Sequence, residues 1–221
     1  MNRTPAYATT GLAVPSQPSA PARERRAATR PAPLVRDLRE RAGATPRELR
    51  FGPEDLVVVT GLPGSGKSTL MHRTVPGRRV DSQDTRDRWQ TRLAALPYAL
   101  YRPLVRLAHY AGLRRALATG EGVVVHDCGT QPWVRAWLAR EARRRGAALH
   151  LVLLDVDAGA ARRGQRERGR GVSRYAFGRH RHATGRLLRA VERGELPAGC
   201  ASVVLLDRAA ADRLSRIDFA A

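Results

Sequence analysis

The chain has 221 residues, of which 43% are hydrophobic, and its 40 basic against 20 acidic side chains give a formal net charge of +20. This length suits one globular domain that buries a sizeable core. No apolar run approaches the roughly 20 residues that a membrane-spanning helix needs, so we expect no membrane protein.

The basic side chains are arginines except for one lysine, Lys67, which lies within the sequence GLPGSGKST. Such a skew reflects a coding bias toward arginine, so part of the positive charge is composition rather than function. Cys128 and Cys200 have a spacing that fits neither a metal site nor a disulfide framework, and we expect two free thiols. The start of the chain lacks the apolar stretch of a secretory signal, and we expect a cytoplasmic protein.

The first part of the chain, residues 1–50, is predicted to be a basic tail. Residues 1–33 are rich in Pro, Ala and Arg and show no hydrophobic period, which predicts disorder. Residues 34–50 are expected to form short helical pieces that Gly43 and Pro46 interrupt. The folded domain is therefore predicted to span 51–221 and to begin near Phe51, so removal of residues 1–45 is expected to leave stability unchanged.

From Phe51 onward, short apolar runs alternate with helical stretches. Helices are predicted over 84–95, 101–119, 133–146 and 158–193. Strands are predicted at 55–60, 78–81, 122–127, 148–156 and 201–207, the last being the final strand. Uniformly apolar strands that alternate with helices indicate an α/β fold with a parallel sheet of about five strands, covered on both faces.

The most specific motif lies between the first of these strands and a helix. Its residues are Gly61, Leu62, Pro63, Gly64, Ser65, Gly66, Lys67, Ser68 and Thr69. The glycines permit a loop whose backbone N–H groups surround phosphate oxygens, and the following helix N-terminus adds partial positive charge. Lys67 would reach the β- and γ-phosphates and the Ser68 hydroxyl would bind Mg²⁺. The motif predicts a P-loop NTPase fold, a three-layer sandwich, with ATP and Mg²⁺ as cofactors; the alternative is an ordinary glycine turn before a helix.

A second metal ligand is expected at the end of a strand. Asp127 ends GVVVHD and is predicted to hold Mg²⁺ together with Ser68, whereas His126 is interpreted as a packed strand histidine. Asp155 and Asp207 also end strands and compete for this role. Each of the three aspartates could instead cap the helix that follows.

Four segments together give a family resemblance: GLPGSGKST, VDSQDTR (80–86), VVVHDCGT (123–130) and an arginine-rich segment over 162–170. This combination resembles the P-loop kinases of the polynucleotide-kinase and zeta-toxin type, many of which are described as AAA-domain ATP-binding proteins. The resemblance covers about residues 55–206. It implies an aspartate that accepts the proton of the substrate hydroxyl, an arginine that holds a substrate phosphate, and arginines in a helical lid.

By position, the resemblance assigns the base to Asp84 and the anion-binding role to Arg86 or Arg88. In the family, the arginine follows the base by three residues. Counted back from Arg86, this spacing puts Gln83, which cannot act as a base, at the base position. Both alignments of this segment with the family pattern, or registers, stay open. A third possibility is that the segment has no catalytic role and is a solvent-exposed helix start that Asp84 caps. Asp81 and Asp87 are expected to matter much less.

The resemblance also implies that arginines of a helical lid stabilise the transferring phosphoryl group. The candidates are Arg162, Arg163, Arg166, Arg168 and Arg170, and Arg162 and Arg166 lie one helical turn apart. A solvated basic face is the alternative. Tyrosines and arginines over 97–117 could stack and hold an acceptor, although a tyrosine–leucine stripe at helical spacing is more typical of core.

We therefore expect a Mg²⁺-dependent kinase that transfers the γ-phosphate of ATP to a hydroxyl of an anionic acceptor, such as a nucleic-acid 5′ end, a nucleotide or a phosphorylated small molecule. One alternative is an ATP-binding or ATP-hydrolysing regulatory switch without an acceptor. Another is a nucleic-acid-binding protein whose ATP site serves assembly, which the +20 charge favours. The absence of an Asn-Lys-x-Asp motif favours ATP over GTP.

Overall fold

Six strands rich in valine and leucine form the main sheet. The computed structural model describes residues 34–41, 43–126, 132–167 and 173–220, and every strand pairing in this sheet is parallel. In spatial order the strands are β1 (Leu34–Asp37), β7 (Ser202–Leu206), β6 (Leu149–Leu154), β3 (Leu56–Gly61), β5 (Val123–His126) and β4 (Arg79–Val80). The four central strands are buried almost throughout, as expected of parallel strands covered on both faces.

Seven helices connect or follow these strands in the described part of the chain. They are α1 (Lys67–Thr74), α2 (Ser82–Arg92), α3 (Tyr98–Leu117), α4 (Pro132–Arg144), α5 (Ala158–Glu167), α6 (Arg174–Glu192) and α7 (Arg208–Arg213). None of the described helices is long and apolar enough to cross a membrane.

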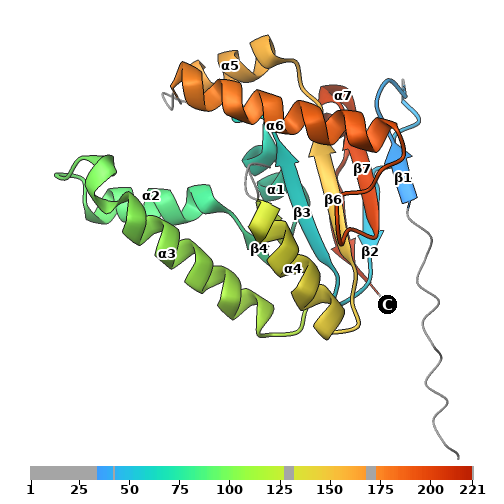
Figure 1. Ribbon diagram of the computed structural model, residues 1–221, viewed down its shortest axis with the longest axis horizontal. Helices are drawn as coiled ribbons and strands as arrows, with labels where there is room; N and C mark the ends of the chain where they lie inside the picture. The colour runs from blue at the N-terminus through green and yellow to red at the C-terminus, as the bar shows by residue number, and fades with distance from the viewer. Residues whose placement is uncertain (1–33, 42, 127–131, 168–172, 221) are drawn as a thin grey trace, which may run out of the picture. The chain divides into compact units, whose positions relative to one another are not determined.

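Two hydrophobic layers hold the helices against the sheet. On one face, Met71 of α1 and Ala210 of α7 pack in the same cluster as Val57 of β3. On the other face, Leu138 of α4 and Val191 of α6 belong to the cluster of Val58, the next residue of the same strand. Successive strand residues point to opposite faces of a sheet, so the two clusters lie on opposite faces. In Figure 1, α4 and α6 lie in front of the sheet and α1 lies behind it. The predicted α/β three-layer sandwich is confirmed, with six parallel strands instead of about five.

The prediction for residues 34–50 is wrong. This segment contains two strands, β1 and β2 (Glu48–Phe51), rather than helical pieces, and β1 pairs with β7 at the edge of the main sheet. Leu38, directly after β1, is only 2% exposed in the core. The folded unit therefore begins before Phe51, whereas residues 1–33 lie outside the described part of the chain.

A second, smaller sheet pairs β2 with a strand that comes after the predicted final strand. The segment β8 (Arg216–Phe219) pairs in parallel with β2, and Leu49 of β2 and Ile217 of β8 are buried in the core cluster that contains α1. The strand at 201–207 is thus not the last one. The helices of the lid, α5 and α6, meet the phosphate loop through a third small cluster of Leu62, Ala161 and Phe177.

Candidate nucleotide and acceptor site

The loop between β3 and α1 has the backbone conformation that its glycines were expected to provide. Gly61, Gly64 and Gly66 have φ angles of 148°, 86° and 97°, all in the left-handed region. A Cβ atom at Gly64 would collide with the carbonyl oxygen of Ala161 in α5. A side chain at this position is therefore excluded twice, by its backbone angles and by the close approach of the lid.

Lys67 belongs to the loop rather than to the hydrophobic core. The residue is 4% exposed, and its Nζ donates hydrogen bonds to the carbonyl oxygens of Gly61 at 3.0 Å and Leu62 at 2.7 Å. The ammonium group is thus held directly beside the backbone that is expected to surround phosphates. This is the position from which a lysine of such a loop reaches phosphate oxygens.

A cavity of about 720 Å³ opens beside the loop, which is within the usual size range of small-molecule sites. Five segments line it: the loop and α1, the start of α2, the end of β5, α5 and α6. The lining residues are Pro63, Gly64, Gly66, Lys67, Ser68, Thr69, His72, Arg73, Gln83, Asp84, Arg86, Asp87, His126, Gly164, Gln165 and His180. The structure therefore brings the phosphate loop and the predicted acceptor residues into one cavity.

Asp84 lies in this cavity, where its carboxylate is held from two sides. Nε2 of His72 is 3.0 Å from Oδ1, and Nε of Arg79 is 3.9 Å from Oδ2. Gln83 also lines the cavity, so the residue at the base position lies in this cavity in either of the two predicted registers. Asp84 does not cap α2, because the cap is Asp81, whose side chain accepts from the backbone N–H of Gln83.

Arg86 lines the cavity and rests on an aromatic ring. Its guanidinium lies 4.3 Å from the centroid of the Tyr98 ring, and Tyr98 in turn meets Tyr101 edge to face. Tyr101 itself is core, at 4% exposed. Arg88, the second anion-binding candidate, does not line the cavity and donates instead to the carbonyl oxygen of Asp84 at 3.2 Å. Arg86 is therefore the better-placed anion-binding arginine.

Asp81, to which the sequence analysis assigned little weight, is the most buried carboxylate near the loop. It is 2% exposed, and Nδ1 of His126 lies 2.6 Å from its Oδ1. Burial alone would raise the pKa of Asp81, but hydrogen bonds from His126, the Gln83 backbone and Ser68 hold it well below its usual range. An ionised carboxylate therefore lies beside the Ser68 hydroxyl.

Oxygen atoms of the kind that Mg²⁺ prefers lie together beside the loop. A carboxylate oxygen of Asp81 and one of Asp84 lie within 4.8 Å of each other and of a His72 nitrogen, which itself contacts Asp84, and the Ser68 hydroxyl adjoins Asp81. Hydroxyl and carboxylate oxygens are the ligands that Mg²⁺ prefers. Asp127, the predicted metal ligand, and Cys128 lie outside the described residues. Ser68 and Asp81 are thus the described residues best placed to hold the metal of a bound nucleotide.

The lid contributes other residues to the cavity than the sequence analysis expected. Arg162 and Arg166 are exposed and do not line it; the guanidinium of Arg162 lies 4.7 Å from the ring centroid of Phe177 in α6. Gly164 and Gln165 of α5 and His180 of α6 line the cavity instead. Arg163 is exposed, and Arg168 and Arg170 lie outside the described residues.

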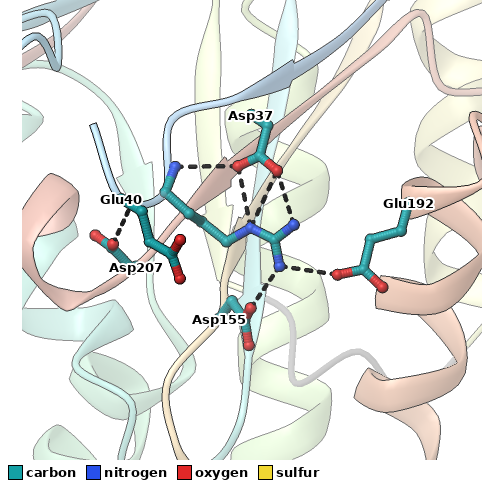
Figure 2. Close-up of polar contacts among 6 residues, drawn as sticks. Asp37, Glu40, Asp155, Glu192 and Asp207 are labelled. Carbon is teal, nitrogen blue, oxygen red and sulfur yellow. Dashed lines mark hydrogen bonds and ion pairs between the residues drawn. The ribbon is translucent and has the colours of Figure 1, made fainter.

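The two competing strand-end aspartates have structural partners, as Figure 2 shows. Oδ2 of Asp155 accepts from Nη1 of Arg39 at 2.7 Å, and the same guanidinium pairs with Asp37 and Glu192. Asp207 caps α7 through Oδ1 and accepts from the backbone N–H of Glu40 through Oδ2 at 2.8 Å. Neither aspartate lines the cavity, so both serve to attach the N-terminal segment.

Sequence reasoning missed two histidines and a glutamine, which are His72, His180 and Gln165. His72 follows Ser68 by four residues, so both lie on the same face of α1, and this spacing was a usable signal. His126 was interpreted as a packed strand residue, and it is buried, yet it also reaches the cavity. His180 and Gln165 carry no recognisable signal, because their position depends on how the lid packs.

A comparison with one solved structure supports this fold. A solved structure from the PezAT toxin–antitoxin system of Streptococcus pneumoniae is similar over 72% of this chain and 69% of its own, at 13% identity and a TM-score of 0.51. The tunicamycin resistance protein of Deinococcus radiodurans is similar over 72% and 87%, at 15% identity and a TM-score of 0.39. No curated protein matches the chain. The sequence pattern of the AAA domain family matches residues 56–192, from the phosphate-loop strand to the end of the lid, and the chain belongs to this family of P-loop nucleotide-binding proteins.

Proposed function

We propose that the protein is a Mg²⁺-dependent phosphotransferase that moves the γ-phosphate of ATP to a hydroxyl group of an anionic acceptor. The observation that supports this most is the single cavity in which the phosphate loop meets Asp84 and Arg86. A nucleotide site needs the loop and one carboxylate for the metal, which Asp81 supplies, but no second carboxylate and no further cationic side chain on α2. A kinase needs both, one to orient a hydroxyl and one to hold the acceptor.

In this proposal the loop and Lys67 bind the triphosphate. Backbone N–H groups at the start of α1 favour phosphate oxygens, and the ammonium group of Lys67 turns from the loop carbonyls toward the β- and γ-phosphates. Mg²⁺, which Ser68 and Asp81 would hold, supplies charge neutralisation on the phosphates when it is bound.

Asp84 is the proposed base. His72 holds Oδ1 of this carboxylate, so the hydroxyl of an acceptor can donate to the other oxygen and lose its proton as the bond to phosphorus forms. The transition state of phosphoryl transfer is loose, so the carboxylate mainly orients the hydroxyl and takes the proton late. The hydroxyl proton thus ends on Asp84, the bond between the γ-phosphorus and the bridging oxygen of ADP breaks, and ADP remains on the phosphate loop until it dissociates.

Arg86 supports an anionic acceptor. Its guanidinium is pre-oriented over Tyr98, which lowers the conformational entropy lost when an acceptor carboxylate or phosphate binds. Arg73 also lines the cavity, but its guanidinium donates to the carbonyl oxygens of Ala211 and Leu214, so the argument for an anionic acceptor rests on Arg86. A phosphorylated or otherwise acidic acceptor is the chemistry that Arg86 fits.

An ATP-hydrolysing switch without an acceptor is the second candidate. The position of Arg162 and Arg166 outside the cavity favours it, because a kinase lid commonly supplies an arginine to the transferring group. γ-Labelled ATP incubated with the protein and a pooled set of anionic hydroxyl compounds separates the two. Label on an acceptor supports the kinase, and label in free phosphate alone supports the switch.

A further inference from the structure

Helix α5 touches the phosphate loop through one side of its surface. Ala161 is fully buried on this side and Gln165 is 9% exposed. A Cβ atom at Gly64 would lie 2.8 Å from Cγ of Gln165, so the glutamine stem packs directly on the apex of the loop. The glutamine is therefore held in place by the same contact that requires glycine at position 64.

The amide of Gln165 has an unusual environment for a polar group. Its Nε2 atom is buried and has no hydrogen-bond partner among the described residues, although the residue lines the cavity. A buried amide donor without an acceptor is unfavourable, so such a group indicates that an acceptor joins it in the working protein. The adjoining loop is built for phosphate oxygens, which are strong acceptors.

The arginines on either side of Gln165 have a different placement. Arg162 stacks on Phe177, which is 2% exposed, and thereby joins α5 to α6, while Arg166 is exposed to solvent. Within the described part of α5, the polar side chain that lines the cavity is Gln165.

We infer that Gln165 is a lid residue that contacts the terminal phosphate of bound ATP, donating from Nε2 to one of its oxygens. This inference rests on the proposed nucleotide site. The loop and the start of α1 surround the inner phosphates, and the terminal phosphate extends into the space between Gly64, the lid and the acceptor side. A neutral donor there distinguishes a triphosphate from a diphosphate. Arg162 has the separate task of holding the lid helices together.

The variant Gln165→Met tests this assignment, because methionine keeps the length of the stem on Gly64 and removes the amide. Affinities for ADP and for a non-hydrolysable β,γ-imido analogue of ATP are measured by calorimetry on the full chain, with Mg²⁺ present. We expect the analogue to bind roughly ten-fold more weakly than to the wild type and ADP to bind within about two-fold, as for loss of one hydrogen bond to a charged group. Gln165→Glu, which has the same size, should weaken the analogue further by charge repulsion and serves if the methionine variant does not fold.

Arg162→Ala is the matched control from the same helix. It should lower the melting temperature and change both affinities by a similar factor, because it loosens the lid without touching phosphate. Equal losses of the two nucleotides in Gln165→Met, or unchanged binding of the analogue, would overturn the assignment. If the wild type binds both nucleotides but transfers no label to any acceptor, the proposed kinase activity is wrong. The role of Gln165 is then still decided by the measured affinities of its variants. Wild-type protein that binds neither nucleotide would overturn both.

Discussion

Nε2 of His72 lies 3.0 Å from Oδ1 of Asp84, across the cavity wall where α1 meets α2. His72 belongs to the helix that starts at the phosphate loop, and Asp84 belongs to the element expected to receive the acceptor. The contact therefore joins the nucleotide side of the site to its acceptor side. A change in one residue should affect how the other is oriented.

We expect His72→Ala to lower the rate of phosphoryl transfer by about 10-fold to 100-fold at saturating ATP, because the carboxylate of Asp84 loses the group that orients it. ATP affinity should stay near that of the wild type. His72→Gln should recover most of the rate, since its amide can donate to the same oxygen. Single-turnover transfer measured with all three proteins checks this, and an unchanged rate in His72→Ala would contradict the orienting role.

Asp81→Asn should have a large effect, contrary to the expectation from sequence alone. The carboxylate caps α2, binds His126 and adjoins Ser68, so the neutral amide should weaken Mg²⁺-dependent nucleotide binding by about ten-fold or more. Titration of ATP with increasing Mg²⁺ measures this. Asp87→Asn, in the helix that Asp81 caps, is the control and should bind Mg²⁺·ATP normally.

Acid should destabilise the protein in part through Asp55. Burial raises its pKa, but hydrogen bonds from His150 and from the backbone N–H groups of Ala148 and Gly52 lower it overall. A carboxylate with a lowered folded-state pKa stabilises the fold above its unfolded pKa of about 3.9 and loses that contribution as the pH falls through the folded value.

Asp55→Asn should consequently be less stable at pH 7 and lose less further stability between pH 5 and pH 3 than the wild type does. Urea unfolding at several pH values measures the difference. Asp212→Asn, at a carboxylate whose side chain is 61% exposed, should follow the wild-type profile. Parallel pH profiles of Asp55→Asn and the wild type would show that this carboxylate makes no contribution.

Removal of residues 1–45 should lower the melting temperature, whereas the sequence alone predicted no change. The deletion takes away β1, which pairs with β7, and Leu38, which is 2% exposed. Leu38→Ala tests the same packing by itself and should cost about 2–4 kcal/mol of unfolding free energy. Arg41→Ala, an exposed neighbour, should change it by no more than about 0.5 kcal/mol. Equal stability of the two variants would mean that this segment does not stabilise the domain.

The central part of the fold could be predicted because its signals are local. Each of the five expected strands is a contiguous apolar run or is implied by the alternation of strands and helices along the chain. The conformation of the phosphate loop depends on glycines within one stretch of nine residues. The missed strands β1, β2 and β8 are four residues long and mix leucine, isoleucine or phenylalanine with charged residues. Their partners lie far along the chain, as Leu34 opposite Ser202 illustrates, so no local pattern marks them.

The lid shows the same limit at the level of side chains. Helical spacing correctly predicted that Arg162 and Arg166 share a face, but it cannot tell which face meets the loop. That choice depends on the close approach of Ala161 to Gly64, a contact between distant parts of the chain. The same approach brings Gln165 rather than an arginine to the cavity.

Transfer of label from γ-labelled ATP to an acceptor, compared among the wild type, Lys67→Ala and Asp84→Asn, tests the central claim most directly. We expect transfer by the wild type and none by Lys67→Ala, which should still fold because Nζ bonds to the carbonyls of Gly61 and Leu62 in the loop rather than to the core. Asp84→Asn should bind ATP normally and transfer label about 10²-fold to 10⁴-fold more slowly. Gln83→Ala decides between the two registers, since it should slow transfer comparably only if Gln83 occupies the base position. Equal transfer by the wild type and Asp84→Asn, or release of free phosphate alone by the wild type, would contradict the account.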